Sequence, residues 1–288
     1  MMTAENGQIS TLLRQSRPTI SFEFFPPKDE AGFESLNDSF HQLQAVGPDF
    51  ISVTYGAMGS NQERSLDVVR KFANLIPTIA HLTCIGANRE NLRGLLDTYS
   101  ALGVAAILAL RGDIPKTFEG EPLGDFKRAI DLVDLARETN FQIGVAAFPE
   151  KHPESPSLEH DIAVLKLKQE SGASFAMTQL FFDINSYFNL VQAARESDVT
   201  IPILPGLMPI ANARQVLRMA EMSGAKVPDE LVHELSSATD EEAARAIGMN
   251  FSVELAKKLI DGGAPGIHIF TLNHHRAAIE LLEGAGLT

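Results

Sequence analysis

Short runs of apolar and β-branched residues recur along the chain, and stretches with helical periodicity lie between them. Between the first two runs, for example, Phe33, Leu36 and Phe40 are spaced to share one face of a helix. This alternation is typical of an α/β protein, and eight repeats predict one (β/α)8 TIM barrel over residues 1–288, with a doubly wound sheet as the alternative. The expected strands are Thr19 to Phe25, Phe50 to Tyr55, Ala80 to Ile85, Ala105 to Leu110, Gln142 to Phe148, Phe175 to Phe181, Ile201 to Leu204 and Gly266 to Leu272.

The longest interval lies between the seventh and eighth expected strands, and the pattern there predicts additional helices. One of them is expected to begin with a capping box formed by Thr239 and Glu242. After the fifth strand, Ser155 is expected to cap a helix. Residues 1–18 precede the first strand and are interpreted as an N-terminal extension of the single domain.

The first strand carries an ionisable residue among apolar neighbours, in the stretch "TISFEFFPPK". Side chains alternate along a strand, so Glu23 lies opposite Phe22 and Phe24. If the two phenylalanines meet the outer helices, Glu23 points into the barrel lumen near the carboxyl end of the strand, where barrel enzymes place their chemistry. Burial disfavours the charged form of a carboxyl group, which suits proton donation. The alternative is an exposed glutamate at the end of a strand.

Other expected strands also end in polar residues. These are Thr54, His81, Thr83, the sequence Arg111, Gly112 and Asp113, and then His152 and Gln179. Each has an ordinary explanation alone, since threonine is a good strand former and a lone histidine is usually a surface residue. Several polar groups converging on one barrel mouth need a polar ligand, because buried polar groups cost free energy unless they are hydrogen-bonded.

Asp161 and Lys168 are seven residues apart in the helix that follows the fifth strand, so they lie on one face. In isolation such a face is usually solvated. In a barrel whose fifth loop reaches a ligand, the same face could present Lys168 to a phosphate group.

Composition narrows the classes of protein that the chain can belong to. Hydrophobic residues make up 44% of it and the formal net charge is −13, with no basic stripe, so we expect a globular protein that does not bind nucleic acid. The first twenty residues lack the apolar core of a signal peptide, and no apolar run is long enough for a membrane, so a cytoplasmic location is expected. The only cysteine, Cys84, excludes an internal disulfide and a multi-cysteine metal site, and its position favours the core.

Familiar nucleotide and hydrolase motifs are missing. The chain has no G-x-G-x-x-G after a strand, no P-loop, no H-E-x-x-H and no G-x-S-x-G. If a dinucleotide binds, it therefore binds in the barrel mouth without the usual fingerprint.

The segments "FEFFPP", "SVTYGA", "HLTC", "ALRGD", "VAAFPEKHPE", "MTQLFFD", "PILPGLMP" and "FTLN" occur in this order from Thr19 to Asn273. Together they resemble the bacterial methylenetetrahydrofolate reductase family. The resemblance implies a barrel that carries FAD at the carboxyl end of its strands. It also implies that NADH or NADPH reduces the flavin and departs before methylenetetrahydrofolate is reduced to methyltetrahydrofolate in the same site.

The resemblance also implies roles for individual residues. Glu23 matches the general acid of the family. Asp113 matches an aspartate beside the flavin whose negative charge tunes the redox potential of the flavin. Positions that match the FAD site are Thr54, His81, Arg111, Gly112, Asp113, Ala129, Ala146, Phe148, His152, Asp161 and Lys168. Substrate-binding positions are Gln179, Gln215, Met219 and His274.

Some positions depart from the family pattern. Phe148 and Arg128 stand where tyrosines are common, Met219 where a larger aromatic or a leucine is common, and His274 where some relatives have arginine. The chain stops soon after the barrel, so no regulatory domain is expected. A homo-oligomer is expected because relatives of this type associate.

Two other functions remain open at the level of sequence. One is a flavin-free barrel lyase or pterin-binding transferase that uses Glu23 as an acid. The other is a non-catalytic carrier of flavin or folate, which would have no need of an acid in the lumen.

Overall fold

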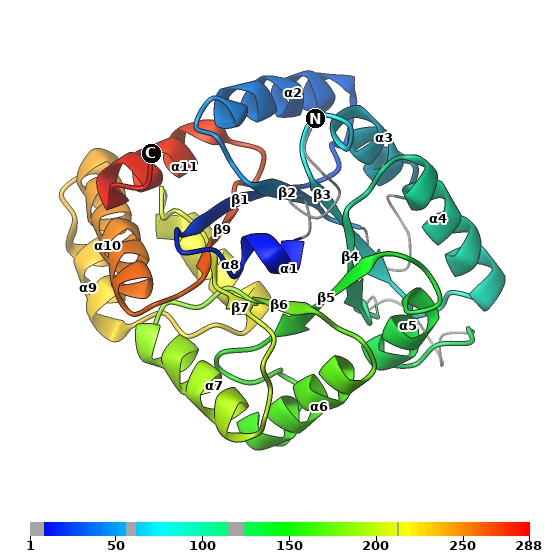
Figure 1. Ribbon diagram of the computed structural model, residues 1–288. Helices are drawn as coiled ribbons and strands as arrows, with labels where there is room; N and C mark the ends of the chain where they lie inside the picture. Colours follow the sequence, from blue (N-terminus) through cyan, green and yellow to red (C-terminus); the bar gives the residue numbers. More distant parts are fainter. Residues whose placement is uncertain (1–8, 56–61, 115–123, 212) are drawn as a thin grey trace.

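The computed structural model describes residues 9–55, 62–114, 124–211 and 213–288. Its strands form one parallel sheet rolled into a barrel, with helices around the outside (Figure 1). The strands are β1 Thr19–Phe24, β2 Phe50–Val53, β3 Thr78–Thr83, β4 Ala106–Leu110, β5 Gln142–Ala147, β6 Phe175–Thr178, β7 Ile203–Leu204, β8 Gly206–Leu207 and β9 Gly266–Phe270. The helices are α1 Ile9–Leu12, α2 Glu30–Gln44, α3 Gln62–Phe72, α4 Arg89–Ala101, α5 Ala129–Ala136, α6 Leu158–Glu170, α7 Ile184–Glu196, α8 Ala213–Ser223, α9 Asp229–Ser237, α10 Glu241–Asp261 and α11 His275–Ala285.

The barrel closes through a segment that the structure divides into two strands. β7 pairs with β6, and β8 pairs with β9, so consecutive residues of one segment join the two edges of the sheet. Pro205 lies between them and has no amide N–H to donate, which interrupts the ladder. The predicted strand Ile201 to Leu204 is therefore corrected to two short strands, while the predicted eight-unit barrel is confirmed.

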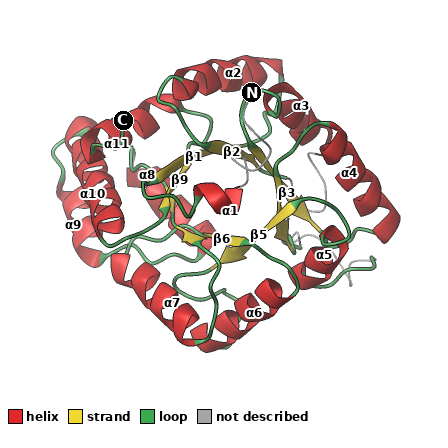
Figure 2. Ribbon diagram, in the orientation of Figure 1, coloured by secondary structure: helices red, strands yellow, loops and turns green. Residues whose placement is uncertain are grey.

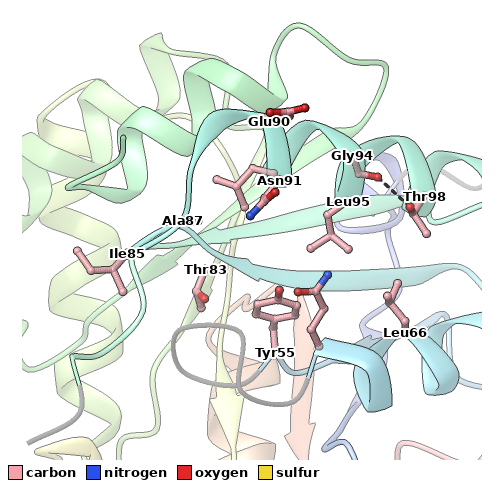
Figure 3. A pocket seen from close by; sticks show the side chains of 13 residues that line it. Tyr55, Leu66, Thr83, Ile85, Ala87, Glu90, Asn91, Gly94, Leu95 and Thr98 are labelled. Carbon is pink, nitrogen blue, oxygen red and sulfur yellow. Dashed lines mark hydrogen bonds between the residues drawn. The ribbon is translucent and has the colours of Figure 1, made fainter. Parts of the chain in front are cut away.

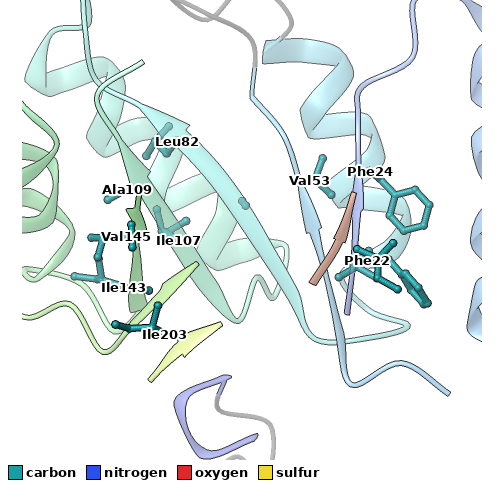
Figure 4. Packing of buried hydrophobic residues seen from close by; sticks show 14 of the residues in the cluster. Phe22, Phe24, Val53, Leu82, Ile107, Ala109, Ile143, Val145 and Ile203 are labelled. Carbon is teal, nitrogen blue, oxygen red and sulfur yellow. The ribbon is translucent and has the colours of Figure 1, made fainter. Parts of the chain in front are cut away.

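The outer faces of the strands pack against the helices and form the main core. Phe22 and Phe24 are fully buried there, and the Phe24 ring centroid lies 6.0 Å from that of Phe40 and 6.2 Å from that of Phe72. Figure 4 shows Phe22, Phe24 and Val53 among the side chains of this cluster. With the phenylalanines outside, the alternation of β1 turns Ser21 and Glu23 into the lumen.

Helix α1 covers the amino-terminal end of the barrel. Ile9, Leu12 and Leu13 pack with apolar side chains of the lumen, including Phe50 and Phe175. The backbone N–H of Ser10 donates to the side chain of Gln142, the first residue of β5, at 3.0 Å. Figure 2 shows this short helix within the ring of strands. Part of the predicted N-terminal extension thus belongs to the barrel core.

The additional helices predicted before the last strand are α8, α9 and α10. Two predicted helix caps were displaced. Asp240, not Thr239, caps α10 by accepting from the Ala243 N–H, and Ser157, not Ser155, caps α6 by accepting from the His160 N–H. In both cases the true cap is the last extended residue before the helix. None of the described helices combines the length and the apolar character that crossing a membrane requires.

Candidate active site

Glu23 lies in the lumen near the carboxyl end of β1, as the alternation of the sequence predicts. Its exposed fraction is 6%. The carboxylate Oε2 atom lies 3.4 Å from Nε2 of His268 on β9 and 3.6 Å from Nε2 of His81 on β3. Three strands thus bring a carboxyl group and two imidazoles together inside the barrel.

The segment after β9 holds the backbone of Glu23 and Phe25 in place. The Thr271 hydroxyl donates to the Glu23 carbonyl at 2.7 Å. The Asn273 side chain accepts from the Phe25 N–H and donates to the Phe25 carbonyl, both at 2.9 Å. Asn273 adopts φ of 62°, a left-handed conformation that asparagine tolerates better than most residues. The "FTLN" segment therefore fixes the position of the candidate acid.

Sequence reasoning missed His268. It occurs in β9 between Ile267 and Ile269, the same polar-within-apolar alternation that singled out Glu23. The signal was therefore present in the pattern of the last strand. The contact between His268 and Glu23, which lie 245 positions apart, is visible only in the closed barrel.

Two buried polar atoms on β3 have no hydrogen-bond partner among the described residues: His81 Nε2, which lies beside Glu23, and Thr83 Oγ1. Burial lowers the pKa of His81, although the nearby Glu23 carboxylate opposes this effect, so the imidazole favours its neutral form. Unpaired buried polar atoms are costly and point to a ligand or a water. The carboxyl-terminal side of β3 is therefore suited to receive a polar ligand.

A cleft of about 600 Å³ opens at the carboxyl ends of β4 and β5, between α5 and α6. A volume of this size is typical of small-molecule and cofactor sites. The cleft brings together ten of the predicted site residues: Arg111, Gly112, Asp113, Ala129, Ala146, Phe148, His152, Asp161, Lys168 and Gln179. Its walls are mostly apolar, with charged groups at defined places.

Lys168 is the main cationic side chain on the α6 wall of the cleft. Burial lowers its pKa to about 8, while the charge of Asp161 on the same helix face acts in the opposite direction. Asp161 also accepts from the His152 backbone N–H at 2.7 Å, which ties the β5–α6 loop to the helix. The predicted placement of Asp161 and Lys168 on one helix face is confirmed, since both line this cleft.

The loop after β5 frames the other side of the cleft. The Phe148 ring stands edge to face with His152, with centroids 4.7 Å apart. Arg111 at the end of β4 forms a two-pronged ion pair with Glu154 of this loop, and this pairing raises the pKa of the arginine. Strand β4 and the loop are thus joined across the cleft.

Gly112 connects the cleft to the Glu23 region. Its φ is +85°, and a Cβ atom there would approach the Thr83 Cβ to 2.8 Å. A glycine is therefore required by both backbone conformation and space. Because Thr83 and His81 lie on the same strand and the same face, the cleft and the buried acid are neighbours.

Among the remaining predicted residues, those whose side chains the structure describes do not line this cleft. His81 belongs to the Glu23 cluster, and Thr54 lies at the adjoining end of β2, where its N–H donates to the Phe24 carbonyl at 2.9 Å. Met219 packs in a separate apolar cluster with Leu180 and Phe182. Gln215 falls in α8, and its side chain lies outside the described residues.

His274 borders a different cavity, of about 520 Å³, between α2, α11 and the end of β9. A further cavity, of about 530 Å³, lies below α4. Figure 3 shows Tyr55 and Thr83 together beneath Asn91 and Leu95 in this third cavity.

Cys84 is buried, as its sequence position predicts, and its Sγ lies 3.4 Å from the Arg128 carbonyl. Burial raises the pKa of the thiol to about 12, so the thiolate is disfavoured. Within the described ranges no group of three or more histidine, cysteine or carboxylate side chains is arranged to hold a metal ion.

Comparison with known proteins gives a consistent result. The family model of methylenetetrahydrofolate reductase matches residues 8–286. The chain is 37% identical to methylenetetrahydrofolate reductase (NADH) 1 of Arabidopsis thaliana, over 97% of this chain and 50% of that protein. It is 35% identical to 5,10-methylenetetrahydrofolate reductase of Pectobacterium carotovorum, over 95% of this chain and 92% of that protein. The chain thus spans about half the length of the plant relative and nearly all of the bacterial one.

A solved structure supports the fold. An uncharacterized protein from Clostridium thermocellum, which binds two copies of 5-methyl-5,6,7,8-tetrahydrofolic acid, superimposes with a TM-score of 0.68 over 96% of this chain and 97% of that chain. The sequence identity is 15%, so the similarity concerns the fold alone.

Proposed function

The chain belongs to the methylenetetrahydrofolate reductase family, and we propose that it reduces methylenetetrahydrofolate to methyltetrahydrofolate, with FAD as cofactor and NADH or NADPH as electron donor. The observation that carries the proposal is the buried Glu23 carboxyl, held in the lumen beside a cleft of cofactor size. A carrier of flavin or folate would have no need of an acid in this position.

The side chains of the cleft fit FAD. The cofactor combines a flat aromatic ring with an anionic pyrophosphate, and the cleft combines apolar walls with a cationic Lys168. The buried atoms His81 Nε2 and Thr83 Oγ1, unpaired within the described part of the chain, offer polar contacts at the barrel mouth. When bound, FAD supplies hydride chemistry that protein side chains do not provide.

In this proposal the cleft residues bind and orient the cofactor. Lys168 would attract the phosphates, and Asp161 holds the β5–α6 loop to the helix by accepting from the His152 backbone N–H. Phe148 presents an aromatic face, and Gly112 allows the backbone to approach closely. Asp113 is exposed at the cleft. Its negative charge would favour the cationic iminium form of the folate and would tune the redox potential of the flavin. The two substrates use the same site in turn.

Glu23 acts as the general acid. It donates its proton to the folate nitrogen that leaves when the five-membered ring opens, and positioned proton donors of this kind contribute roughly 10²- to 10⁴-fold to rate. Gln179, which lies exposed at the edge of the cleft, is proposed to contact the pterin and also the nicotinamide. Gln215 is proposed to contact the pterin. Met219 and His274 are proposed to lie beside the folate or the nicotinamide.

The direct test is an absorbance spectrum of the purified protein, followed by anaerobic titration with NADH and with NADPH. We expect a yellow protein that bleaches with one or both donors and regains its colour when methylenetetrahydrofolate is added. A colourless protein that takes up no flavin on reconstitution would support a flavin-free lyase or transferase instead.

A further inference from the structure

The loop between β5 and α6, residues 148–157, is poor in backbone hydrogen-bond donors. Pro149, Pro153 and Pro156 lie within it, and proline has no amide N–H. The loop nevertheless keeps the side chain of His152 at the cleft. A loop with few internal hydrogen bonds opens easily, so other donors are needed to hold it in one conformation.

Lys151 supplies such donors from its side chain. Its Nζ atom donates to the Ser155 carbonyl at 2.6 Å and to the His152 carbonyl at 3.3 Å. An ammonium group carries three donors, and hydrogen bonds from a charged group are stronger than those between neutral groups. The two contacts close the segment from Lys151 to Ser155 into a turn.

The same turn carries contacts of the cleft. The Ser155 N–H donates to the His152 carbonyl at 2.9 Å, and the His152 N–H donates to Asp161 of α6 at 2.7 Å. The Glu154 side chain, which borders the cleft, projects from this turn as well. Lys151 is not among the residues that line the cleft, so it holds the turn from outside the binding site.

The backbone conformation of Lys151 is unfavourable for a lysine. Its φ is 87°, in a region that glycine adopts without penalty and that other residues adopt rarely. Strain of this kind persists where surrounding contacts enforce it, often beside functional sites. Glycine would suit this backbone better but has no donor, so the hydrogen bonds of the ammonium group are what a lysine adds here.

We propose that Lys151 is a positioning residue that holds the β5–α6 loop in the conformation that binds the cofactor. It acts through Phe148 and His152, which line the cleft, and not by touching the cofactor. A loop that is ordered before binding loses less conformational freedom on binding, which increases affinity. The consequence for FAD rests on the proposed function, whereas the holding of the loop does not.

The first test is amide hydrogen exchange of the full-length protein, with and without FAD, read by mass spectrometry of peptides that cover the loop. Lys151→Met keeps the length of the side chain but removes the donors, so we expect faster exchange of the His152 and Ser155 amides without FAD. Lys151→Arg retains donors and should restore slow exchange. Lys257→Met, which removes an ammonium group paired with a glutamate of the same helix α10, is the matched control and should leave the loop unchanged.

Lys151→Gly separates the effect of the side chain from that of the backbone. Glycine adopts φ of 87° without strain, so if backbone shape alone determined the loop, this variant would exchange as slowly as the wild type. We expect it to exchange at least as fast as Lys151→Met, because it also lacks the ammonium group. Slow exchange in either variant would overturn the proposal.

The second test is the affinity for FAD, measured by titrating the flavin-free protein and following the quenching of flavin fluorescence. Lys151→Met should weaken FAD binding by roughly tenfold, the size expected for losing a hydrogen bond from a charged group. Lys151→Arg should recover most of the affinity. The rate of flavin reduction by NADH or NADPH at saturating FAD should stay at the wild-type value, because the proposed role ends once the cofactor is bound.

The two measurements together separate the possible outcomes. Weaker FAD binding without faster exchange would contradict the proposal, because Lys151 would then act on the cofactor directly. Faster exchange with unchanged FAD affinity would contradict it as well, because order in the loop would not contribute to binding. A wild-type protein that takes up no flavin would instead reject the proposed function, while the exchange data would still show whether Lys151 holds the loop.

Discussion

Lys168 is a proposed binding residue whose position costs stability. Its amine lies on the cleft wall, where burial lowers the pKa to about 8 from the ordinary 10.5. Below pH 8 the folded chain holds a poorly solvated charge that the unfolded chain solvates freely. As the pH rises from 8 to 10.5, the unfolded chain binds the additional proton, so the folded state becomes relatively more stable until the penalty is gone.

Lys168→Met should therefore increase the free energy of unfolding at pH 7 by about 1–2 kcal/mol, less than the full shift implies because the side chain is only partly buried. The gain over the wild type should shrink between pH 8 and pH 10.5, and urea denaturation at several pH values measures it. Lys166→Met, on the same helix but paired with Asp198 at 3.2 Å, is the matched control and should show no such gain. A loss of stability at pH 7 in Lys168→Met would contradict the inferred burial cost.

Glu23 is the residue on which the proposed chemistry depends. Glu23→Gln keeps the shape of the side chain but removes the acid, so folate reduction should fall by roughly 10²- to 10⁴-fold. Reduction of bound flavin by the nicotinamide should persist, because that half of the reaction needs no proton from Glu23. Stopped-flow absorbance separates the two halves.

Glu150→Gln is the control for Glu23→Gln. Glu150 is a half-buried glutamate that accepts from the Lys226 backbone N–H at 2.7 Å, so the same chemical change is made elsewhere. If both variants reduced folate at the wild-type rate, Glu23 would have no part in the mechanism.

At the scale of elements, barrel closure depends on the two-residue strands β7 and β8. Gly206 begins β8 directly after Pro205, and its N–H donates to the Thr178 hydroxyl at 2.9 Å. A Cβ atom at Gly206 would lie 2.6 Å from the Phe270 ring and 2.7 Å from the Thr178 carbonyl. The position of Gly206 is therefore packed too tightly for any side chain.

Gly206→Ala should lower the free energy of unfolding by about 1–3 kcal/mol, the usual range for an added methyl group in a filled core. Gly94→Ala is the matched control: a Cβ atom there meets nothing within 4 Å, and alanine in the interior of α4 should stabilise by about 0.5–1 kcal/mol. Urea denaturation of both variants gives the comparison. Equal free energies of unfolding for the two variants would show that the closing segment can shift to make room for the added methyl group.

At the scale of the whole molecule, the two ends of the barrel differ in kind. The amino-terminal end is filled by α1 and apolar side chains, whereas the carboxyl-terminal end contains Glu23, His81 and the cleft. This division agrees with the general pattern of such barrels, in which one end supplies stability and the other chemistry.

Ile9→Ala should therefore cost about 2–5 kcal/mol of unfolding free energy, as expected for a fully buried isoleucine. Leu75→Ala removes methyl groups from a side chain that is 54% exposed and should change stability little. Thermal or urea denaturation measures both. A negligible effect of Ile9→Ala would show that α1 contributes little to the core.

Local patterns predicted much of this arrangement correctly. The alternation of Phe22, Glu23 and Phe24 is a property of the strand itself, so it indicated the lumenal acid without any knowledge of neighbours. The spacing of Asp161 and Lys168 placed both on one helix face in the same way. The caps of α6 and α10 were displaced by two residues and one residue because several serines, threonines and aspartates stand near each start, and only backbone conformation selects among them.

The sequence by itself determined the strand and helix periodicity, the inward face of β1 and the ordered motifs of the reductase family, since each of these is written in neighbouring residues. Only the tertiary structure decided that His268 lies against Glu23, that Pro205 divides the closing segment and that α1 enters the barrel. These depend on which distant residues meet when the ring of strands closes, and periodicity along the chain does not specify such contacts.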